Sequence, residues 1–349
     1  MKYFLLIVSL SVSFLSHAQR SYRNDFLNVG AGARGMALAG SMTANVADET
    51  GGFWNPAGLQ ALSSKYTVGL MHAEYFAGLS KYDFASFIYK SNDSTAFGFS
   101  FIRMGTDDIP NTLELYDDNG NIDYSRISYF SAADYALFLS FSQNRKNIGL
   151  SYGAQAKIIY RHLGPFANAY GFGFDAGLQY RFGKWQAGAM LKDASSTFNA
   201  WFFDTSELEE VFLETGNEIP GDTVEFSVPQ LNTGLSRKFV FDERFSMLSE
   251  MGLIFTFDGQ RNALISTKQM AIEPHIGFEG NYKDLVFLRA GFGKFSFIPD
   301  FDKDVLVFEP SIGLGLKLYN FRIDYALTNI GNASGALYSN VFSLAYEFN

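Results

Sequence analysis

The sequence predicts an all-β fold: a 14-stranded antiparallel transmembrane β-barrel with a small N-terminal hatch. Apolar residues alternate with small or polar residues through fourteen segments, and the connections between these segments alternate between short and long. The 349 residues are 17% aromatic and only 18% charged. Strands of a membrane barrel alternate between lipid and lumen, and aromatic girdles mark the interfaces. We therefore divide the chain into a signal peptide (1–18), a hatch (19–64) and a barrel (65–349).

The composition argues against several other classes of protein. The chain has no cysteine, which excludes a disulfide scaffold, a thiolate metal centre and a cysteine nucleophile. Its net charge of −9 argues against nucleic-acid binding, which needs clustered Lys and Arg. We expect no metal, no cofactor and no nucleic-acid partner.

The first residues have the pattern of an export signal. Lys2 precedes an apolar run from Tyr3 to Leu15, and Ala18 closes a small-x-small cleavage motif, so we expect the mature chain to begin at Gln19. The run is shorter than the roughly 20 residues of a membrane-spanning helix. No later stretch is apolar for long enough to be one, so the sequence predicts a protein exported to the outer membrane.

The clearest alternation runs from Tyr170 to Phe182. One face is apolar and aromatic, whereas the other carries glycines and a few polar residues. This pattern places the first face toward lipid and the second toward the lumen. The fourteen segments begin near Tyr66, Tyr82, Ala96, Ala133, Ile148, Tyr170, Trp185, Gln230, Phe245, Ile272, Leu285, Leu306, Phe321 and Val341.

The lengths of the connections favour a membrane barrel over a soluble β-sandwich, which would also alternate. Connections after even segments are short, as at Gly183 and at Lys283. Most connections after odd segments are long, as at 106–131 and 193–228. Outer-membrane barrels have short periplasmic turns and longer extracellular loops, and a sandwich has no reason to follow that order.

The predicted inward face carries charges of both signs, which indicates ion pairing in a filled or wet lumen. A selective ion channel would more often show one dominant sign. The predicted lumen charges are Asp134, Asp175, Arg181, Glu250, Arg322 and Asp324.

The segment before the barrel is rich in Gly and Ala and lacks strand alternation. Gly30-x-Gly32-x-x-Gly35 matches the dinucleotide-binding pattern, but no βαβ unit surrounds it, so we interpret these glycines as sites of close backbone packing. The candidate hatch motif comprises Gly35, Met36, Gly40, Trp54, Asn55, Pro56, Ala57, Gly58 and Leu59.

Asn55-Pro56-Ala57 in such a segment resembles the hatch of the FadL-type outer-membrane barrels. The string Ala-Arg-Gly-Met-Ala-Leu-Ala-Gly at 33–40, with Gly-Leu-Gly-Leu at 313–316, resembles the PorV/PorQ family found in Bacteroidetes. The resemblance covers the whole mature chain, but only the hatch strings are specific. It implies a role in the type IX secretion system, with a large translocon barrel and secreted substrate proteins as partners.

No motif for catalysis or metal binding is present, and we name no catalytic residue. His72, His162 and His275 are far apart in sequence and match no metal-binding spacing. Two acidic groups, at 117–123 and 300–304, resemble calcium loops. Polar turns explain them more simply, because 300–304 continues without the expected Gly and Glu.

The connection 193–228 is acidic and also carries apolar side chains. We interpret it either as a solvated loop helix over the barrel mouth or as a docking element for a partner protein. The candidate partner residues are Trp201, Phe202, Phe203, Leu208, Val211 and Phe212.

Three functions follow from these observations. The first is a non-enzymatic outer-membrane component of type IX protein secretion, in contact with membrane lipid. The alternative is a FadL-like conduit for hydrophobic small molecules. The third is a surface lipid hydrolase, which needs a His close to a Ser. An apolar lumen pocket beside a kinked, laterally open strand favours the conduit, whereas a plugged polar lumen under large ordered loops favours the partner role.

Overall fold

A computed structural model describes residues 24–117, 119–206, 209, 212, 213, 216, 218–300, 303–328 and 338–349. Seventeen strands form a single sheet. Three are short accessory strands, and the other fourteen make the barrel wall that the sequence predicts. The wall strands are β1 (Tyr66–Tyr75), β2 (Ser80–Asn92), β3 (Thr95–Asn111), β4 (Ser128–Arg145), β5 (Leu150–Leu163), β6 (Ala167–Phe182), β7 (Trp185–Lys192), β10 (Gln230–Val240), β11 (Phe245–Thr256), β13 (Ala271–Tyr282), β14 (Val286–Asp300), β15 (Lys303–Leu318), β16 (Phe321–Thr328) and β17 (Ser339–Phe348).

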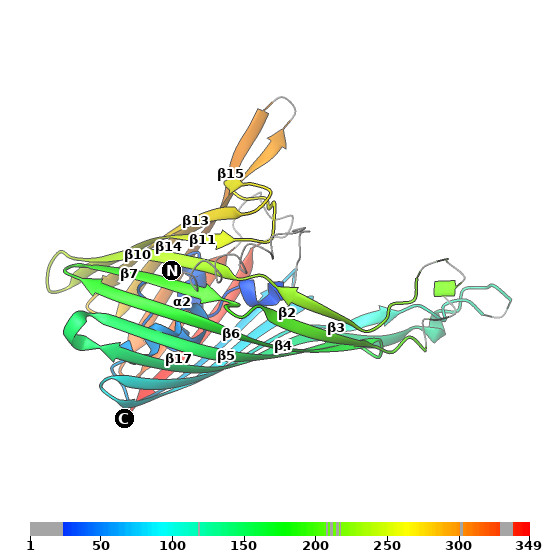
Figure 1. Cartoon of the computed structure of the whole chain (residues 1–349), viewed down its shortest axis with the longest axis horizontal. Helices are drawn as coiled ribbons and strands as arrows, with labels where there is room; N and C mark the ends of the chain where they lie inside the picture. Colours follow the sequence, from blue (N-terminus) through cyan, green and yellow to red (C-terminus); the bar gives the residue numbers. More distant parts are fainter. Residues whose placement is uncertain are drawn as a thin grey trace, which may run out of the picture.

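The barrel is closed by antiparallel pairing of the first strand with the last. Tyr66 of β1 lies opposite Phe348 of β17, and the pairing continues to Glu74 opposite Asn340. Figure 1 shows the wall strands side by side around a lumen. Closure satisfies the backbone groups that an open sheet edge would expose to lipid, which is why only closed sheets span membranes.

The outward face is apolar, as the alternation predicts. On β6, Tyr170, Phe174 and Leu178 are 57%, 46% and 50% exposed, whereas the alternate positions 171, 173, 175 and 177 are buried. Aromatic rings stack along both rims of this face. One stack joins Tyr66, Tyr89 and Phe348, and another joins Tyr135 and Tyr160. These stacks have the positions of the two aromatic girdles of a membrane barrel.

Residues 24–64 form short helical turns enclosed by the barrel. They comprise η1 (Asp25–Asn28), α2 (Ala33–Ala37), α3 (Gly51–Trp54) and η2 (Pro56–Ala61), drawn in blue inside the barrel in Figure 1. Within the described residues, none of the helices has the length and apolar character needed to cross a membrane. We refer to residues 24–64 as the hatch.

Wall glycines let the hatch approach the strands closely. A Cβ at Gly153 would lie 2.6 Å from the backbone nitrogen of Ala57, and one at Gly188 would lie 2.3 Å from the carbonyl oxygen of Thr43. Both contacts are with backbone, which cannot turn aside as a flexible side chain does. Glycine is therefore required at these positions by the hatch, rather than by a turn in the strand.

The long connections contain more regular secondary structure than the sequence predicts. The connection 193–228 contains β8 (Thr197–Phe203) and β9 (Thr223–Ser227), a hairpin that extends the sheet beside β6. The sequence analysis does not predict this hairpin, in which Phe198 and Phe202 are exposed on one face of β8, and Val224 and Phe226 are exposed on one face of β9. Figure 1 also shows the β3–β4 hairpin extending far from the barrel. The remaining short elements are η3 (Tyr124–Arg126), η4 (Lys146–Ile148) and β12 (Ile265–Ser266).

We predict that Gly153→Leu displaces the hatch and destabilises the barrel by roughly 1–3 kcal/mol, the usual cost of overpacking. Guanidinium unfolding of the refolded protein in detergent measures the free energy of unfolding. Gly280→Leu is the matched control, since the nearest atom to its Cβ, the carbonyl oxygen of Leu288, lies 3.8 Å away. Equal stability of the two variants would contradict the assigned hatch contact.

Candidate functional site

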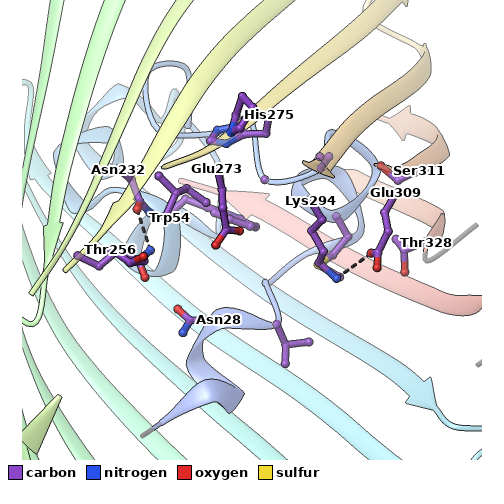
Figure 2. Close-up of a pocket in the computed structure, with 18 of the residues that line it drawn as sticks. Asn28, Trp54, Asn232, Thr256, Glu273, His275, Lys294, Glu309, Ser311 and Thr328 are labelled. Atoms are coloured by element: carbon purple, nitrogen blue, oxygen red, sulfur yellow. Dashed lines mark hydrogen bonds and ion pairs between the residues drawn. The ribbon is translucent and has the colours of Figure 1, made fainter. Parts of the chain in front are cut away.

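A cavity of about 500 Å³ lies between the hatch and the wall. The hatch contributes an apolar floor, and the strands contribute mostly polar side chains, several of them labelled in Figure 2. The floor includes Val29, Met36, Phe53 and Trp54. The wall side chains include Tyr75, Lys192, Asn232, Thr256, Glu273, His275, Lys294, Glu309 and Thr328.

The cavity lies on the long-loop side of the hatch. Tyr75, Lys192, Thr256 and Thr328 are the last or near-last residues of β1, β7, β11 and β16, and each of these strands leads into a connection at that end. Since long loops of membrane barrels are extracellular, this position corresponds to the outer half of the lumen.

The wall has a gap beside the cavity. β13 and β14 pair only from Ile276 opposite Phe292 to Tyr282 opposite Val286. Beyond Phe292, β14 remains paired with β15 alone. Figure 1 shows the far ends of β14 and β15, in orange, extending away from the barrel. β12 covers part of the free edge of β13, because Ile265 pairs with Ile272.

A β-bulge bends β14 at the start of the gap. The register between β14 and β15 shifts between Gly293 and Ser296, and Lys294 has a φ of +50°. A bulge inserts one residue and bends the strand that carries it. Pro274 lies opposite on β13; since proline has no amide hydrogen to donate, it is tolerated where a ladder ends. This is the kinked, laterally open strand that favours a conduit.

An outer groove of about 550 Å³ runs beside the gap and is mostly apolar. It is lined by Leu235, Met251, Leu253 and Phe295, and Met251 is 57% exposed on the barrel exterior. Pro274 and His275 line both the inner cavity and this groove. The two spaces therefore lie on either side of the same stretch of β13, beside the gap between β13 and β14.

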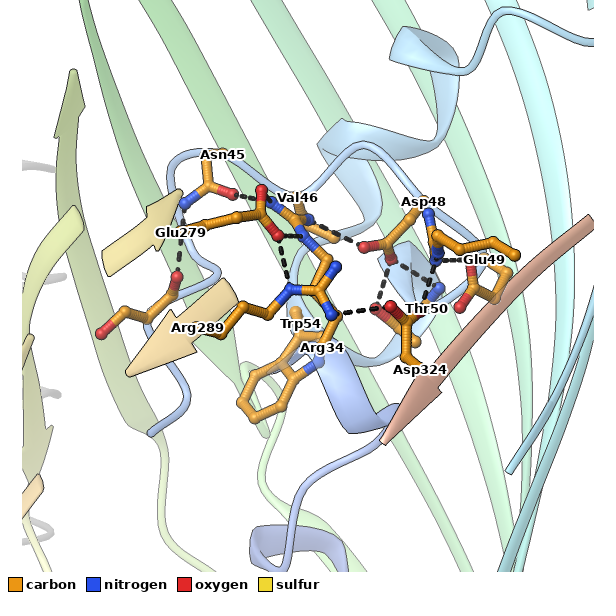
Figure 3. Close-up of polar contacts among 12 residues, drawn as sticks. Arg34, Asn45, Val46, Asp48, Glu49, Thr50, Trp54, Glu279, Arg289 and Asp324 are labelled. Carbon is orange, nitrogen blue, oxygen red and sulfur yellow. Dashed lines mark hydrogen bonds and ion pairs between the residues drawn. The ribbon is translucent and has the colours of Figure 1, made fainter. Parts of the chain in front are cut away.

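Ion pairs tie the hatch to the wall below the cavity (Figure 3). Arg34 of α2 bonds Asp48 of the hatch at 2.9 Å and Glu279 of β13 at 2.8 Å. Glu279 also accepts from Arg289 of β14 at 2.7 Å. Burial alone would raise the pKa of Asp48, but the guanidiniums of Arg34 and Arg322 outweigh it and hold that pKa below its ordinary value.

The network continues through three further wall and hatch groups. Arg289 pairs with Asp324 at 2.6 Å, Asp324 pairs with Arg322 at 2.8 Å, and Arg322 pairs with Glu49 of the hatch. Every charge in this chain of contacts has an opposite neighbour, as buried charges require. The hatch is thus held by charge pairing to the strands on the side of the gap.

On the opposite side, Asn55 fixes the hatch to β6 and β7. Its amide donates to the carbonyl oxygens of Thr43 at 2.8 Å and Leu178 at 3.1 Å, and its side-chain oxygen accepts from the Ala57 amide at 3.1 Å. Asn55 is fully buried. Since a buried amide needs partners for both of its ends, no other residue type fits these bonds equally well.

The other hatch-motif residues gather around Trp54. A Cβ at Gly35 would lie 2.5 Å from its Nε1 atom, and one at Gly40 would lie 3.3 Å from its ring. The indole donates to the Ala31 carbonyl at 2.8 Å. Met36, Gly40 and Trp54 also line the cavity. Pro56, Ala57, Gly58 and Leu59 are buried in η2, so they shape the hatch without facing the cavity.

The predicted lumen charges do not form one group. Glu250 is buried and accepts from the Ala44 and Asn45 amides, and Asp175 pairs with Lys157 at 2.8 Å. Asp134 pairs with Arg161 at 2.7 Å nearer the long loops. Arg322 and Asp324 belong to the network around Arg34. Arg181 is exposed at the short-turn rim, because β6 continues past the end of the plugged lumen.

The candidate partner residues are only partly available. Trp201 donates to Glu225 at 3.0 Å and stacks under Arg161 at 5.0 Å, so it stabilises the β8–β9 hairpin. Phe202 is 51% exposed, Phe203 packs against Trp201, and Phe212 is half-buried. Leu208 and Val211 lie outside the described residues, as does the predicted signal peptide.

No metal site is found in the part of the chain that the structure describes: it has no group of three or more His, Asp or Glu suited to one. Asp117 accepts from its own turn amides, as a polar turn does, and the 300–304 group lies partly outside the described residues. His72 bonds Asp83 at 2.7 Å and His162 bonds Asn168 at 2.8 Å.

Several residues that shape the cavity and the gap were not predicted from the sequence. They are Pro274, His275 and Lys294, which line the cavity, and Arg34, which ties the hatch to β13. A signal for the bulge is present in the sequence. Small residues occupy the inward positions Gly291, Gly293 and then Ser296, so the alternation slips by one residue. The proline inside a strand pattern was a second signal.

No family model matches the chain, and no curated protein matches it. Among solved structures, the toluene transporter TodX of Pseudomonas putida superposes with a TM-score of 0.58 at 16% identity, over 91% of this chain and 98% of TodX. The chain has the fold of the hydrocarbon channels.

Two other solved structures of this fold are also similar. The CymD monoaromatic hydrocarbon channel has a TM-score of 0.56 at 13% identity, over 92% of this chain and 98% of CymD. A FadL homologue from Pseudomonas aeruginosa has a TM-score of 0.51 at 15% identity, over 91% of this chain and 98% of that one. None of the three is a secretion component, so the resemblance to the PorV/PorQ family gains no support, whereas the FadL-type fold does.

We predict that Arg34→Met lowers the free energy of unfolding by about 3–5 kcal/mol, since it leaves Asp48 and Glu279 buried with fewer cationic partners. Guanidinium unfolding in detergent measures the loss. Arg181→Met, at the exposed rim, serves as control and should have little effect. A small effect of Arg34→Met would contradict the anchoring role of the network.

We also predict that Asn55→Ala speeds protease cleavage within the hatch, since the carbonyl oxygens of Thr43, Leu178 and Ala189 lose a buried donor at a cost of about 1–3 kcal/mol. Asn55→Asp should be worse, because it points a carboxylate oxygen at the same carbonyls. Limited proteolysis of the folded barrel measures the rates. Cleavage as slow as in the unaltered protein would show that Asn55 does not hold the hatch.

Proposed function

We propose that this protein is an outer-membrane conduit for hydrophobic small molecules, which leave the barrel sideways through the gap between β13 and β14. The observation that carries the proposal is that Pro274 and His275 line both the inner cavity and the outer groove, beside the gap in the wall. On this proposal, a solute passes between the two spaces without crossing the hatch.

The physical advantage of this route is that an apolar solute never has to cross water below the hatch. It enters the cavity from the long-loop side, contacts Phe53 and Trp54, and moves to the apolar groove at Met251 and Leu253. Transfer of apolar surface from water to such surroundings is favourable, at about 25 cal/mol per Å². The groove then delivers the solute to lipid.

The plugged lower lumen supports the same direction of movement. The hatch fills the space beneath the cavity, and ion pairs and the Asn55 bonds fix it to opposite walls. A continuous aqueous pore would need that space to be open. The protein-secretion interpretation rests on the hatch strings and on loop aromatics, and Trp201 among the aromatics bonds within its own hairpin.

We predict that deletion of Lys294 closes the gap and abolishes uptake. Without the inserted residue, β14 can stay straight and continue its pairing with β13. Uptake of radiolabelled toluene and of radiolabelled 1-octanol by Gram-negative cells that express the protein measures transport. Both should fall to the level of cells that lack it.

Deletion of Asp108 is the matched control. Asp108 lies in a similar one-residue bulge of β3, where the register against β4 shifts between Thr106 and Ile109 and φ is +57°. That bulge lies away from the cavity, so its removal should leave uptake unchanged. Equal uptake by both deletion variants and the unaltered protein would overturn the lateral route.

A further inference from the structure

The far parts of β14 and β15 form a two-stranded ribbon that leaves the barrel wall. We define the ribbon as residues 295–298 of β14 and 305–308 of β15, which begin just beyond the bulge at Lys294. The pairing of β14 with β13 ends at Phe292, and the pairing of β15 with β16 begins only at Ile312. Within the described residues, the ribbon therefore has no further strand at either edge. Figure 1 shows it in orange, extending across the direction of the wall strands.

The outer face of the ribbon is apolar and largely aromatic. Residues directly opposite each other in two paired strands share a face, so Phe297 and Leu306 lie side by side. The alternation of each strand places Phe295 and Phe308 on the same face. Phe297, Leu306 and Phe308 are 45%, 49% and 42% exposed. The opposite face carries smaller side chains, namely Ser296, Ile298, Val305 and Val307.

This outer face continues the lipid-facing side of the wall. On β15, Phe308 and Leu306 follow the lipid-facing Ile312 at positions of the same parity. On β14, the bulge inserts one residue, which keeps Phe292 and Phe295 on the same side of the sheet. Both of their rings contact the ring of Phe308, with centroids 5.9 and 5.6 Å apart. Without the inserted residue, the alternation would turn Phe295 toward the lumen.

The direction of the bend decides what this face meets. A wall strand stands upright in the membrane with its outer face toward lipid. Since the ribbon bends away from the barrel, its outer face turns toward the membrane surface below it (Figure 1). The ribbon leaves the wall at the long-loop end, so that surface belongs to the outer leaflet.

The open edges of the ribbon limit how deeply it can insert. Unpaired backbone groups are not tolerated in the hydrocarbon region, because they need water as a partner. An element with one strongly apolar face solves this problem by lying in the interface, with that face in the acyl chains and its backbone at the level of the headgroups. The large side chains on one face of the ribbon and the smaller ones on the other fit this position.

We propose that the ribbon is a lipid-docking element whose outer face rests in the outer leaflet beside the barrel. The docking residues are Phe295, Phe297, Leu306 and Phe308. Phe295 also lines the outer groove, so docking places the groove directly against lipid. The contact with lipid goes beyond the proposed conduit, because it exists whether or not a solute passes through the gap.

The test uses the absence of cysteine from the chain, since a single introduced cysteine then carries a nitroxide label at one chosen position. Phe297→Cys and Leu306→Cys report on the outer face, and Val305→Cys reports on the opposite face. Leu314→Cys, on the lipid-facing wall, is the reference for lipid, and Tyr124→Cys, between β3 and β4, is the reference for water. Leu314 and Tyr124 are 53% and 73% exposed.

Each labelled full-length barrel is placed in nanodiscs of palmitoyl-oleoyl phosphatidylcholine. Power-saturation EPR then measures how often the label collides with oxygen, which concentrates in lipid, and with a water-soluble nickel chelate. The oxygen-to-nickel ratio at Phe297→Cys and Leu306→Cys should be close to that at Leu314→Cys and several-fold above that at Tyr124→Cys. The ratio at Val305→Cys should be close to that at Tyr124→Cys.

Ratios at Phe297→Cys and Leu306→Cys as low as at Tyr124→Cys would overturn the inference, since the face would then lie in water. Shielding of both labels from oxygen and nickel alike would also overturn it, because protein, from this chain or from a second copy, would then cover the face. Heat-modifiable migration in electrophoresis establishes that each labelled barrel is folded. Toluene uptake by the unlabelled protein tests the conduit separately.

Discussion

The closed backbone ladder is the constraint on which the rest of this structure depends. Lipid offers no hydrogen bonds, so every strand must find two neighbours, and β1 must return to β17. The alternation of aromatic and small residues follows from that closure. An interruption of the ladder within such a wall is costly, and the ladder is interrupted between β13 and β14, where the proposed lateral route runs.

The interruption and the hatch belong to one arrangement. The strands that border the gap, β13 and β14, carry Glu279 and Arg289, which pair with each other. Glu279 also holds Arg34 of the hatch, and Arg289 pairs with Asp324 of β16. The ion pairs join β13, β14 and β16 through side chains in the lower lumen. Above these ion pairs, β13 and β14 can separate while the barrel keeps its shape. The side-chain ion pairs inside the lumen link the strands where backbone hydrogen bonds are missing.

The strand pattern was open to prediction because lipid and lumen impose opposite residue types on alternate positions. All fourteen wall strands were found in this way, although β4 and β15 begin before the predicted starts near Ala133 and Leu306, since their hairpins extend away from the barrel. The β8–β9 hairpin was missed because its two strands, of seven and five residues, are short and a long acidic segment separates them. The cavity was not predictable, since it forms only where the hatch meets the ends of strands that lie far apart in the sequence.

The wall glycines carry a consequence for how this sequence can change over time. Gly153 and Gly188 each occupy a strand position whose side chain is forbidden by hatch backbone from another part of the chain. A larger residue in the wall is tolerable only if the hatch turn opposite retreats. Substitutions in the two regions should therefore accumulate in pairs in related chains, and the hatch and the barrel would evolve as one unit despite their separation in sequence.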